Sequence, residues 1–547
     1  MQREAMDLLL MGGRIYTFKE EGDTVEALGI KAGRIVFAGR LEEALKHDIK
    51  ETCDLKGKTV IPGLGDSHLH LYAYCQNQTY VALDETRSME AFKAKLIEKA
   101  KKTEPGEWIR GAGFDQTKFV ENRMPTRHDL DQVSTDHPIV VRRCCLHVLV
   151  ANSAAIELAK INDQTDQAFP GMIERDEKGD LTGVFREQSA KLFDDIMPDP
   201  LKTADVKKRV MAQVLQDMAS KGITTIHTYA AKLWRYEESI DLYRELEEEG
   251  RLPIRVTVCK DEFFEKAQIG PQDRKPGDKT MYGAYKIFTD GSLGARTAAL
   301  TVPYSDDPGN TGILCDPEVL KETVANACLR GMQPAIHAIG DRAMEATLDA
   351  IENAVKVCPE LLTSPERPPF RIIHAQMVTN EHLQRLKALP IVLDIQPIFL
   401  STDLYWIEDR LGSERLGIAY RWKSMRDEGI MMTGGSDCPV EAYDPLPGIF
   451  AAVARQDLSG YPPGGWQPHE KLSVYDAFCL FSKNIPYANG EQALLGTLET
   501  GKFSDLVVID RDPFEIEAPE ILKLKILRTM VAGEWVFDSG VIPDAGH

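Results

Sequence analysis

The chain has 547 residues, and its 65 basic and 85 acidic side chains give a formal net charge of −20. This acidic balance, without any extended basic cluster, disfavours nucleic acid or an anionic membrane surface as a partner. No stretch approaches the ~20 apolar residues that span a bilayer, and the apolar run near the start is too short for a signal peptide, so we expect a cytoplasmic protein with no membrane partner.

Both ends of the chain show the alternation of antiparallel strands. Residues 7–18 and 27–39 alternate apolar and polar side chains around glycine-containing turns. Residues 505–510 and 529–537 follow the same pattern. The sequence therefore predicts a small flanking β-sandwich built from residues 1–58 and 488–547, with a structural role.

Between the two ends lie mostly apolar runs of strand length, at 59–66, 222–228, 253–259, 282–289, 333–338, 370–375, 391–396 and 430–436. Such runs are typical of parallel strands buried on both faces. Helical patterns such as 341–357 and 380–388 separate them, which favours βαβ units. Eight units predict an α/β fold, a (β/α)8 TIM barrel of residues 59–71 and 206–487, with its active site at the carboxyl ends of the strands.

Two further segments interrupt this pattern. Residues 72–205 contain strand-like stretches of their own, at 108–113, 138–150 and 182–187. Because long structureless loops are uncommon in compact proteins, we expect an inserted α/β domain that covers the active site. Residues 403–429 are rich in charged and aromatic side chains, and we expect them to form a pocket rim or a dimer surface.

Potential metal ligands follow several of the predicted barrel strands. His68 and His70 come after the first run, and two residues apart on an extended segment they project to the same side and can bind one cation. Further candidates end the fourth, fifth, sixth and eighth runs: Lys286, His337, His374 and Asp437. Unrelated core histidines would not explain this shared position at the strand ends. We therefore expect all six side chains to converge at one mouth of the barrel.

This pattern resembles the amidohydrolase superfamily of metal-dependent hydrolases. Longer sequence motifs narrow the resemblance to the YtcJ-like branch of this superfamily, which includes N-substituted formamide deformylases. These motifs are KIFTDGSLGART at 286–297, IHAIGDRA at 336–343, HAQ at 374–376 and GSDCPV at 435–440. The resemblance runs over nearly the whole chain, and we see no departure from it at any expected ligand position.

The resemblance implies two divalent cations per chain, most plausibly zinc. His68, His70 and Asp437 would hold one cation, and His337 with His374 the second. Because an ammonium group has no lone pair, Lys286 would bridge both only as an N6-carboxylated lysine. The alternative is an ordinary buried lysine paired with a carboxylate such as Asp290. A mononuclear site stays open, as does the metal itself.

The resemblance also implies a reaction. A metal-activated hydroxide would attack an amide-type carbonyl, and Asp437 would take the proton and pass it to the leaving nitrogen. We expect hydrolysis of a non-peptide C–N bond in a small molecule, with N-substituted formamides or N-acyl amines as leading substrates. A cyclic amidase, a deaminase or an esterase on the same site is the close alternative, and a non-catalytic metal-binding regulatory protein is less favoured.

Five further residues, within or near these motifs or in the inserted segment, are candidates for supporting roles. Arg296 and Tyr304 could orient the substrate, with a loop-stabilising salt bridge as the alternative for them, and His147 is a further substrate-binding candidate. Asp341 and Gln376 would fix the histidine rings. The sequence leaves the oligomeric state open, with a homodimer among the alternatives.

Overall fold

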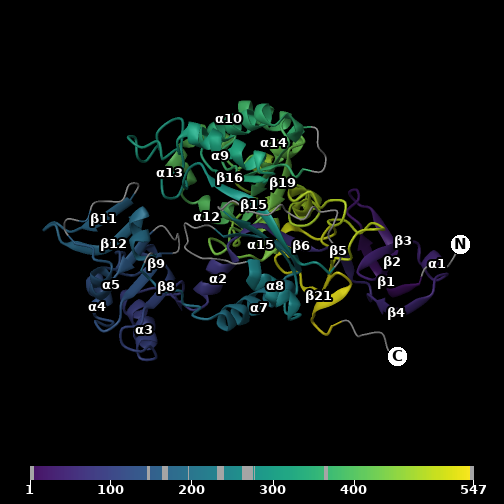
Figure 1. The fold of residues 1–547 in the computed structure, drawn as a ribbon, viewed down its shortest axis with the longest axis horizontal. Coiled ribbons are helices and arrows are strands. Elements are labelled where there is room, and N and C mark those ends of the chain that lie inside the picture. The colour runs from purple at the N-terminus through teal and green to yellow at the C-terminus, as the bar shows by residue number, and fades with distance from the viewer. Residues whose placement is uncertain are drawn as a thin grey trace. The chain divides into compact units, whose positions relative to one another are not determined.

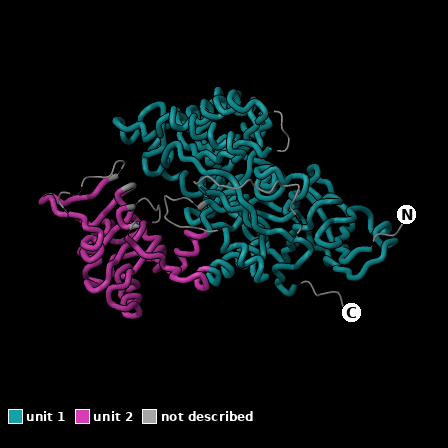
Figure 2. Tube along the Cα trace, in the orientation of Figure 1, with its two compact units in different colours: residues 1–71, 208–231, 238–547 teal, residues 72–207, 232–237 magenta. Residues whose placement is uncertain are grey.

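The computed structural model describes residues 5–143, 148–162, 165, 171–194, 196–230, 240–260, 275, 277–362 and 367–541. It divides into two compact units (Figure 2). The first comprises residues 1–71, 208–231 and 238–547, and the second comprises residues 72–207 and 232–237. Within the described part of the chain, no helix is both long and apolar enough to cross a membrane.

The centre of the first unit is a parallel barrel, which confirms the predicted fold class. Its strands are β6 (Leu64–Leu69), β13 (Ile223–Ala230), β14 (Arg255–Lys260), β15 (Thr280–Phe288), β16 (Pro334–Ala338), β17 (Phe370–His374), β18 (Ile391–Ile395) and β19 (Met431–Gly434). Each pairs in parallel with its neighbour in the order β19-β18-β17-β16-β15-β14-β13-β6. Two backbone hydrogen bonds of 2.7 Å, from Asp437 N to the His68 carbonyl and from His70 N to the Cys438 carbonyl, close the ring.

Helices connect the strands, as the alternating pattern predicts. They include α7 (Ala204–Ser220), α8 (Ile240–Glu248), α9 (Pro317–Leu329), α10 (Asp341–Val357), α11 (Asn380–Ala388), α14 (Trp422–Asp427), α15 (Pro445–Ala454), α16 (Val474–Leu480) and α17 (Ile485–Ala488). The predicted helices 341–357 and 380–388 coincide with α10 and α11. Local chemistry sets their starts: the Thr379 side chain accepts from the backbone N–H of His382 and caps α11.

One prediction needs correction: the run 59–66 is not a single barrel strand. It forms β5 (Thr59–Pro62), which pairs with β1 (Met6–Tyr16) and β20 (Leu506–Ile509) in the flanking sheet, and then β6 of the barrel. The chain changes sheets at Gly63, where a Cβ would lie 2.2 Å from the Thr224 hydroxyl oxygen. A continuous apolar pattern does not reveal this change, because both strands are buried.

The flanking sheet joins the two ends of the chain (Figure 1). Its order is β22-β21-β20-β5-β1-β2-β3, with β4 (Ile49–Asp54) on β1, and it adds β2 (Thr24–Lys31), β3 (Arg34–Gly39), β21 (Ile526–Val531) and β22 (Glu534–Asp538). β1 pairs with β4 through its first half and with β5 through its second. The sheet therefore branches at the irregularity between Met11 and Ile15, where the sequence has Gly12-Gly13.

The second unit has its own sheet, in the order β11-β12-β10-β9-β8-β7. Its strands are β7 (Val81–Ala82), β8 (Ile109–Phe114), β9 (Ile139–Arg143), β10 (Val148–Ala151), β11 (Gly171–Arg175) and β12 (Leu181–Glu187), and its helices include α3 (Met89–Ala100), α4 (Arg127–Asp131) and α5 (Ser153–Leu158). These elements account for the three strand-like stretches expected between residues 72 and 205. Residues 144–147 lie outside the described part of the chain.

Candidate active site

The predicted ligands all lie at the carboxyl ends of barrel strands. His68 is the second-last residue of β6, and His374 is the last residue of β17. Lys286 lies near the end of β15, and His337 near the end of β16. Asp437 follows β19 by three residues. Barrel geometry therefore gathers side chains that are hundreds of residues apart in the sequence.

Three of these side chains form a tight cluster. The Nε2 atoms of His68 and His70 lie 3.2 and 3.1 Å from Oδ1 of Asp437. One potential ligand atom from each residue lies within 4.8 Å of the others. His68 is 1% exposed, and among the described residues neither of its ring nitrogens has a hydrogen-bond partner. Buried imidazole nitrogens left without partners beside a carboxylate fit a divalent cation.

Charge at this cluster suits metal binding. Burial lowers the pKa of His68 well below its usual value, and nearby Lys286 lowers it further, so the imidazole stays neutral. Burial alone would raise the pKa of Asp437, but the close nitrogens of His68 and His70 outweigh it and hold that pKa well below its usual value. Neutral imidazoles and an ionised carboxylate are the ligand forms that metals require.

His337 and His374 continue the cluster. Their ring centroids are 4.5 Å apart, and the His374 ring lies 5.6 Å from that of His68. His374 and Asp437 both have left-handed backbone conformations, with φ of 75° and 57°. Such conformations cost energy in residues with side chains and concentrate at functional sites.

Hydrogen bonds to backbone carbonyls fix which nitrogen the His70 and His337 rings present. Nδ1 of His70 donates to the Tyr229 carbonyl at 2.7 Å, and Nε2 of His337 donates to the Gly291 carbonyl at 3.1 Å. Because a carbonyl oxygen can only accept, the proton must be on these nitrogens. The other nitrogen, Nε2 of His70 and Nδ1 of His337, keeps its lone pair for a ligand.

Gln396, just after β18, fixes which nitrogen the His374 ring presents. Its Oε1 accepts from Nδ1 of His374 at 2.7 Å, while its Nε2 donates to the Asp394 carbonyl at 2.9 Å. This second bond sets the orientation of the amide, so Nε2 of His374 keeps the lone pair. The sequence reasoning missed Gln396, although it ends the seventh predicted run at the same mouth of the barrel.

Asp290 supports the His337 side of the site. Its fully buried carboxylate accepts from the backbone N–H groups of Ile339, Gly340 and Ala299, at 3.1, 2.9 and 2.9 Å, and lies 3.3 Å from Nε2 of His337. Asp290 therefore ties the loop after β15 to the start of α10. The Asp290 oxygens accept hydrogen bonds from these backbone groups and do not pair with Lys286.

Lys286 is buried in the same region, 3% exposed. Its Nζ lies 5.2 Å from the ring centroid of Tyr229 and 4.9 Å from that of Phe288. Burial lowers the pKa of Lys286 to about 7, although Asp437 and Asp394 oppose the shift. Among the described residues no carboxylate oxygen lies within 4.0 Å of this amine, so the alternative of a lysine paired with Asp290 is not what the structure shows.

The remaining predicted residues have other partners. The Arg296 guanidinium pairs with Asp306 at 2.8 Å, and the Tyr304 hydroxyl donates to the Ala298 carbonyl at 2.8 Å, which gives both residues a loop-stabilising contact. Asp341 accepts from the backbone N–H of Thr301 at 3.0 Å. Gln376 donates to the Tyr420 hydroxyl at 2.8 Å. His147 lies outside the described residues, and substrate or ring-orienting roles for these residues stay predictions.

A parallel eight-stranded barrel with a His-His-Asp cluster at the carboxyl ends of its strands defines the class of metal-dependent hydrolases with a TIM-barrel fold. The comparison with known families agrees. The amidohydrolase family model matches residues 51–537, and the chain belongs to this family. It is thus a metal-dependent hydrolase of carbon–nitrogen bonds.

Relatives cover nearly the full chain. The putative amidohydrolase YtcJ of Bacillus subtilis (strain 168) is 32% identical over 97% of this chain and 100% of its own length. The N-substituted formamide deformylase of Arthrobacter pascens is 27% identical over 96% of this chain and 97% of its own. A crystal structure of an uncharacterized metal-dependent hydrolase from Pyrococcus furiosus is 30% identical, with a TM-score of 0.71, over 93% of this chain and 100% of that one.

Proposed function

We propose that this protein hydrolyses a linear, non-peptide C–N bond in a small amide, with N-substituted formamides and N-acyl amines as the leading substrates. The observation that carries the proposal is the buried cluster of His68, His70 and Asp437, in which the Nε2 atoms approach one carboxylate oxygen within 3.2 Å. Similarity to the Arthrobacter pascens deformylase along almost its entire length supports the substrate class.

In this proposal His68, His70 and Asp437 hold one divalent cation, His337 and His374 hold a second, and zinc is the proposed metal. The donor set fits, because three of the imidazoles carry a proton on the nitrogen that faces away and a lone pair on the other. A divalent cation bound there would make water a nucleophile at neutral pH and polarise the substrate carbonyl.

Lys286 completes the proposed site as an N6-carboxylated lysine. Carbon dioxide adds to an unprotonated amine, a C–N bond forms, one N–H proton leaves to water, and the product is an anionic carbamate with two oxygen donors. Lys286 is 3% exposed, and among the described residues no carboxylate oxygen lies within 4.0 Å of its Nζ, so burial disfavours the ammonium form. The carbamate would offer anionic oxygen donors to cations held by the neighbouring histidines, and those cations would balance its charge.

Asp437 is the proposed proton carrier. Its Oδ1 takes a proton from the attacking water and gives it to the leaving nitrogen when the C–N bond breaks. Water thus supplies the hydroxyl to the carbonyl carbon and one proton to the amine, so that a carboxylic acid and an amine are released. The low pKa of Asp437 keeps its carboxylate in the basic form that begins this sequence.

Metal analysis and a substrate screen test the proposal. We expect about two metal equivalents per chain, and turnover of formamides or acyl amines by the metal-loaded enzyme. Preferential turnover of cyclic amides, amidines or esters would instead favour the cyclic amidase, deaminase or esterase alternative. A protein that binds no metal after metal-supplemented expression would overturn the proposal.

The variant Asp437→Asn tests the proton carrier. We expect it to abolish turnover while most of the metal stays bound, because the amide oxygen can still face the cation but cannot accept a proton. Glu381→Gln, an exposed change on α11, is a suitable control that should keep full activity. Unchanged turnover in Asp437→Asn would remove the assignment.

A further inference from the structure

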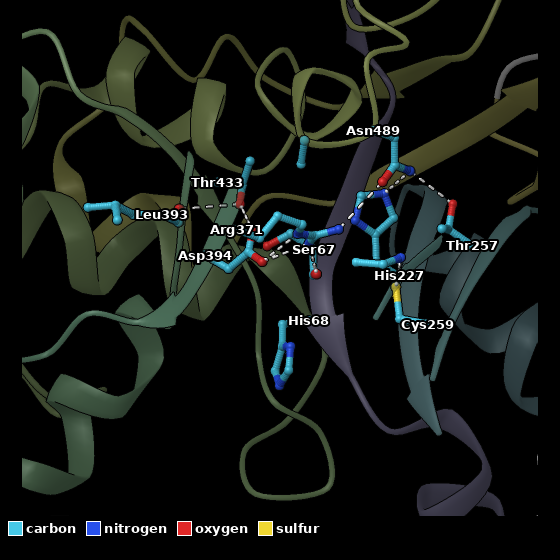
Figure 3. A network of polar contacts seen from close by, with 12 residues as sticks. Ser67, His68, His227, Thr257, Cys259, Arg371, Leu393, Asp394, Thr433 and Asn489 are labelled. Carbon is cyan, nitrogen blue, oxygen red and sulfur yellow. Dashed lines mark hydrogen bonds and ion pairs between the residues drawn. The ribbon is translucent and has the colours of Figure 1, made fainter. Parts of the chain in front are cut away.

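A charged pair lies inside the barrel, where TIM barrels usually have layers of branched apolar side chains. Arg371 on β17 and Asp394 on β18 are both 0% exposed, and the Nε and Nη2 atoms of Arg371 lie 2.8 Å from Oδ2 of Asp394. Figure 3 shows the guanidinium between Asp394 and Ser67. Arg371 precedes His374, the last residue of its strand, by three residues.

The alternation of side chains places this pair in a polar layer below the ligands. Tyr229, Cys259, Ala284, Ala335 and Ile373 form a small buried apolar cluster. In an extended strand, residues two apart share a side. The side chains two positions earlier on β13, β14 and β17, namely His227, Thr257 and Arg371, therefore form the next layer, and the Asn489 side chain reaches His227 and Thr257 at 2.9 and 3.0 Å (Figure 3).

Strand β6 is irregular beside this layer. It advances three residues, from Asp66 to Leu69, while its partner β13 advances two, from Ile226 to Thr228. A β-bulge of this kind disrupts the ladder locally and occurs often beside active sites. The bulge includes His68.

Side chains hold the peptide group that joins Ser67 to His68. Its carbonyl accepts from Nη2 of Arg371 at 2.8 Å, and its N–H donates to Oδ1 of Asp66 at 2.9 Å. Asp66 also accepts from the backbone N–H and the hydroxyl of Ser436, the residue before Asp437. The chain of contacts thus runs from Arg371 through the backbone of His68 to the backbone beside Asp437.

Stability alone gives no reason for the Arg371–Asp394 pair. Removing two charges from water is costly, and replacing a buried ion pair by apolar side chains of similar volume is often neutral or stabilising. What an apolar pair cannot do is donate to the Ser67 carbonyl. A buried carbonyl without a donor would be free to turn and to carry His68 with it.

We propose that Arg371 is a positioning residue for the metal centre. Asp394 fixes the orientation of the Arg371 guanidinium, which donates to the Ser67 carbonyl and so sets the plane of the peptide group that joins Ser67 to His68. This inference rests on the proposed function, because it takes His68 as a metal ligand. Thr433 on β19 donates to the second oxygen of Asp394 and completes the support.

The test measures metal binding rather than turnover. The full-length apoprotein, prepared with a chelator, is titrated with Co²⁺ while its visible absorption bands are recorded. Arg371→Lys keeps the charge but loses the planar fork that reaches Asp394 and Ser67 together. We expect it to weaken Co²⁺ binding about 10- to 100-fold, as is typical for changes behind a metal ligand, and to alter the absorption bands.

Arg255→Lys is the matched control. Arg255 is also 0% exposed and pairs with a buried aspartate, Asp505, through Nε at 2.6 Å and Nη2 at 2.9 Å. It begins β14, at the opposite end of the barrel from the ligands. We expect this variant to lose thermal stability to a similar degree but to bind Co²⁺ within twofold of the wild type.

A double variant separates positioning from folding. Arg371→Met with Asp394→Leu should fold, because it removes both charges together, and should still bind Co²⁺ at least 10-fold more weakly. Co²⁺ affinity and absorption equal to the wild type in Arg371→Lys and in the double variant would overturn the inference. If neither variant folds, Thr433→Val, which removes the hydroxyl that donates to Asp394, is titrated instead. Unchanged Co²⁺ binding in Thr433→Val would overturn the inference as well. A wild-type protein that binds no Co²⁺ would instead remove the proposed function.

Discussion

Asp290→Asn tests the idea that one buried carboxylate organises the His337 side of the site. An asparagine oxygen in the place of Oδ2 would keep the contacts with Gly340 and Ala299 but would set an NH2 group against the N–H of Ile339, which now donates over 3.1 Å. A hydrogen bond to a charged group contributes about 1.5–3 kcal/mol, and an unsatisfied buried donor costs about 1–3 kcal/mol. The two contributions together give an expected destabilisation of about 2.5–6 kcal/mol.

The assay compares thermal unfolding and bound metal in the wild type, in Asp290→Asn and in Asp316→Asn. Asp316 is an exposed control, because its side chain also accepts from backbone N–H groups, those of Glu318 and Val319, at the start of α9. We expect Asp290→Asn to lower the unfolding temperature by several degrees and to reduce metal content below that of the wild type, with only a small effect in Asp316→Asn. Equal unfolding temperatures and equal metal content in Asp290→Asn and the wild type would refute the reasoning.

Two further outcomes follow from single buried contacts. Gln396→Leu removes the acceptor for Nδ1 of His374, so we expect metal affinity to fall about 10- to 100-fold, measured by chelator competition; unchanged affinity would mean that Gln396 does not fix the ring. Burial raises the pKa of Asp403 from 3.8 to about 7, despite a hydrogen bond from Tyr420. Because the folded state then binds the extra proton, the wild type should lose stability relative to Asp403→Asn as pH rises from about 4 to about 7; a difference in unfolding temperature that stays constant across this range would contradict the shift.

The local pattern of apolar and polar residues was sufficient to predict the positions of most barrel strands. The seven runs from 222–228 onward coincide with β13 to β19 within a few residues, and α10 and α11 have the predicted bounds. Their hydrophobic period depends on near neighbours in the chain and on burial, which a sequence displays directly. The switch at Gly63 is different, because β5 and β6 are equally buried and only their partners differ.

The hydrogen bonds of the predicted ligands were less predictable from the sequence. Asp341 and Gln376 follow His337 and His374 closely in sequence, yet their hydrogen bonds go to Thr301 and Tyr420. The hydrogen bonds that the rings make go to Gln396, just after another strand, or to backbone carbonyls, which have no sequence signature. Nearness along the chain is a poor guide where side chains meet across a barrel.

The amino-acid sequence by itself determined the strand and helix pattern, and the placing of His68, His70, Lys286, His337, His374 and Asp437 at strand ends, because hydrophobic period and the position of polar residues are written along the chain. Only the tertiary structure decided which nitrogen the His70, His337 and His374 rings present, how the β6 bulge is held and that Arg371 reaches the Ser67 carbonyl. These features depend on register between strands and on donors and acceptors that meet across the barrel interior. No local segment contains that information.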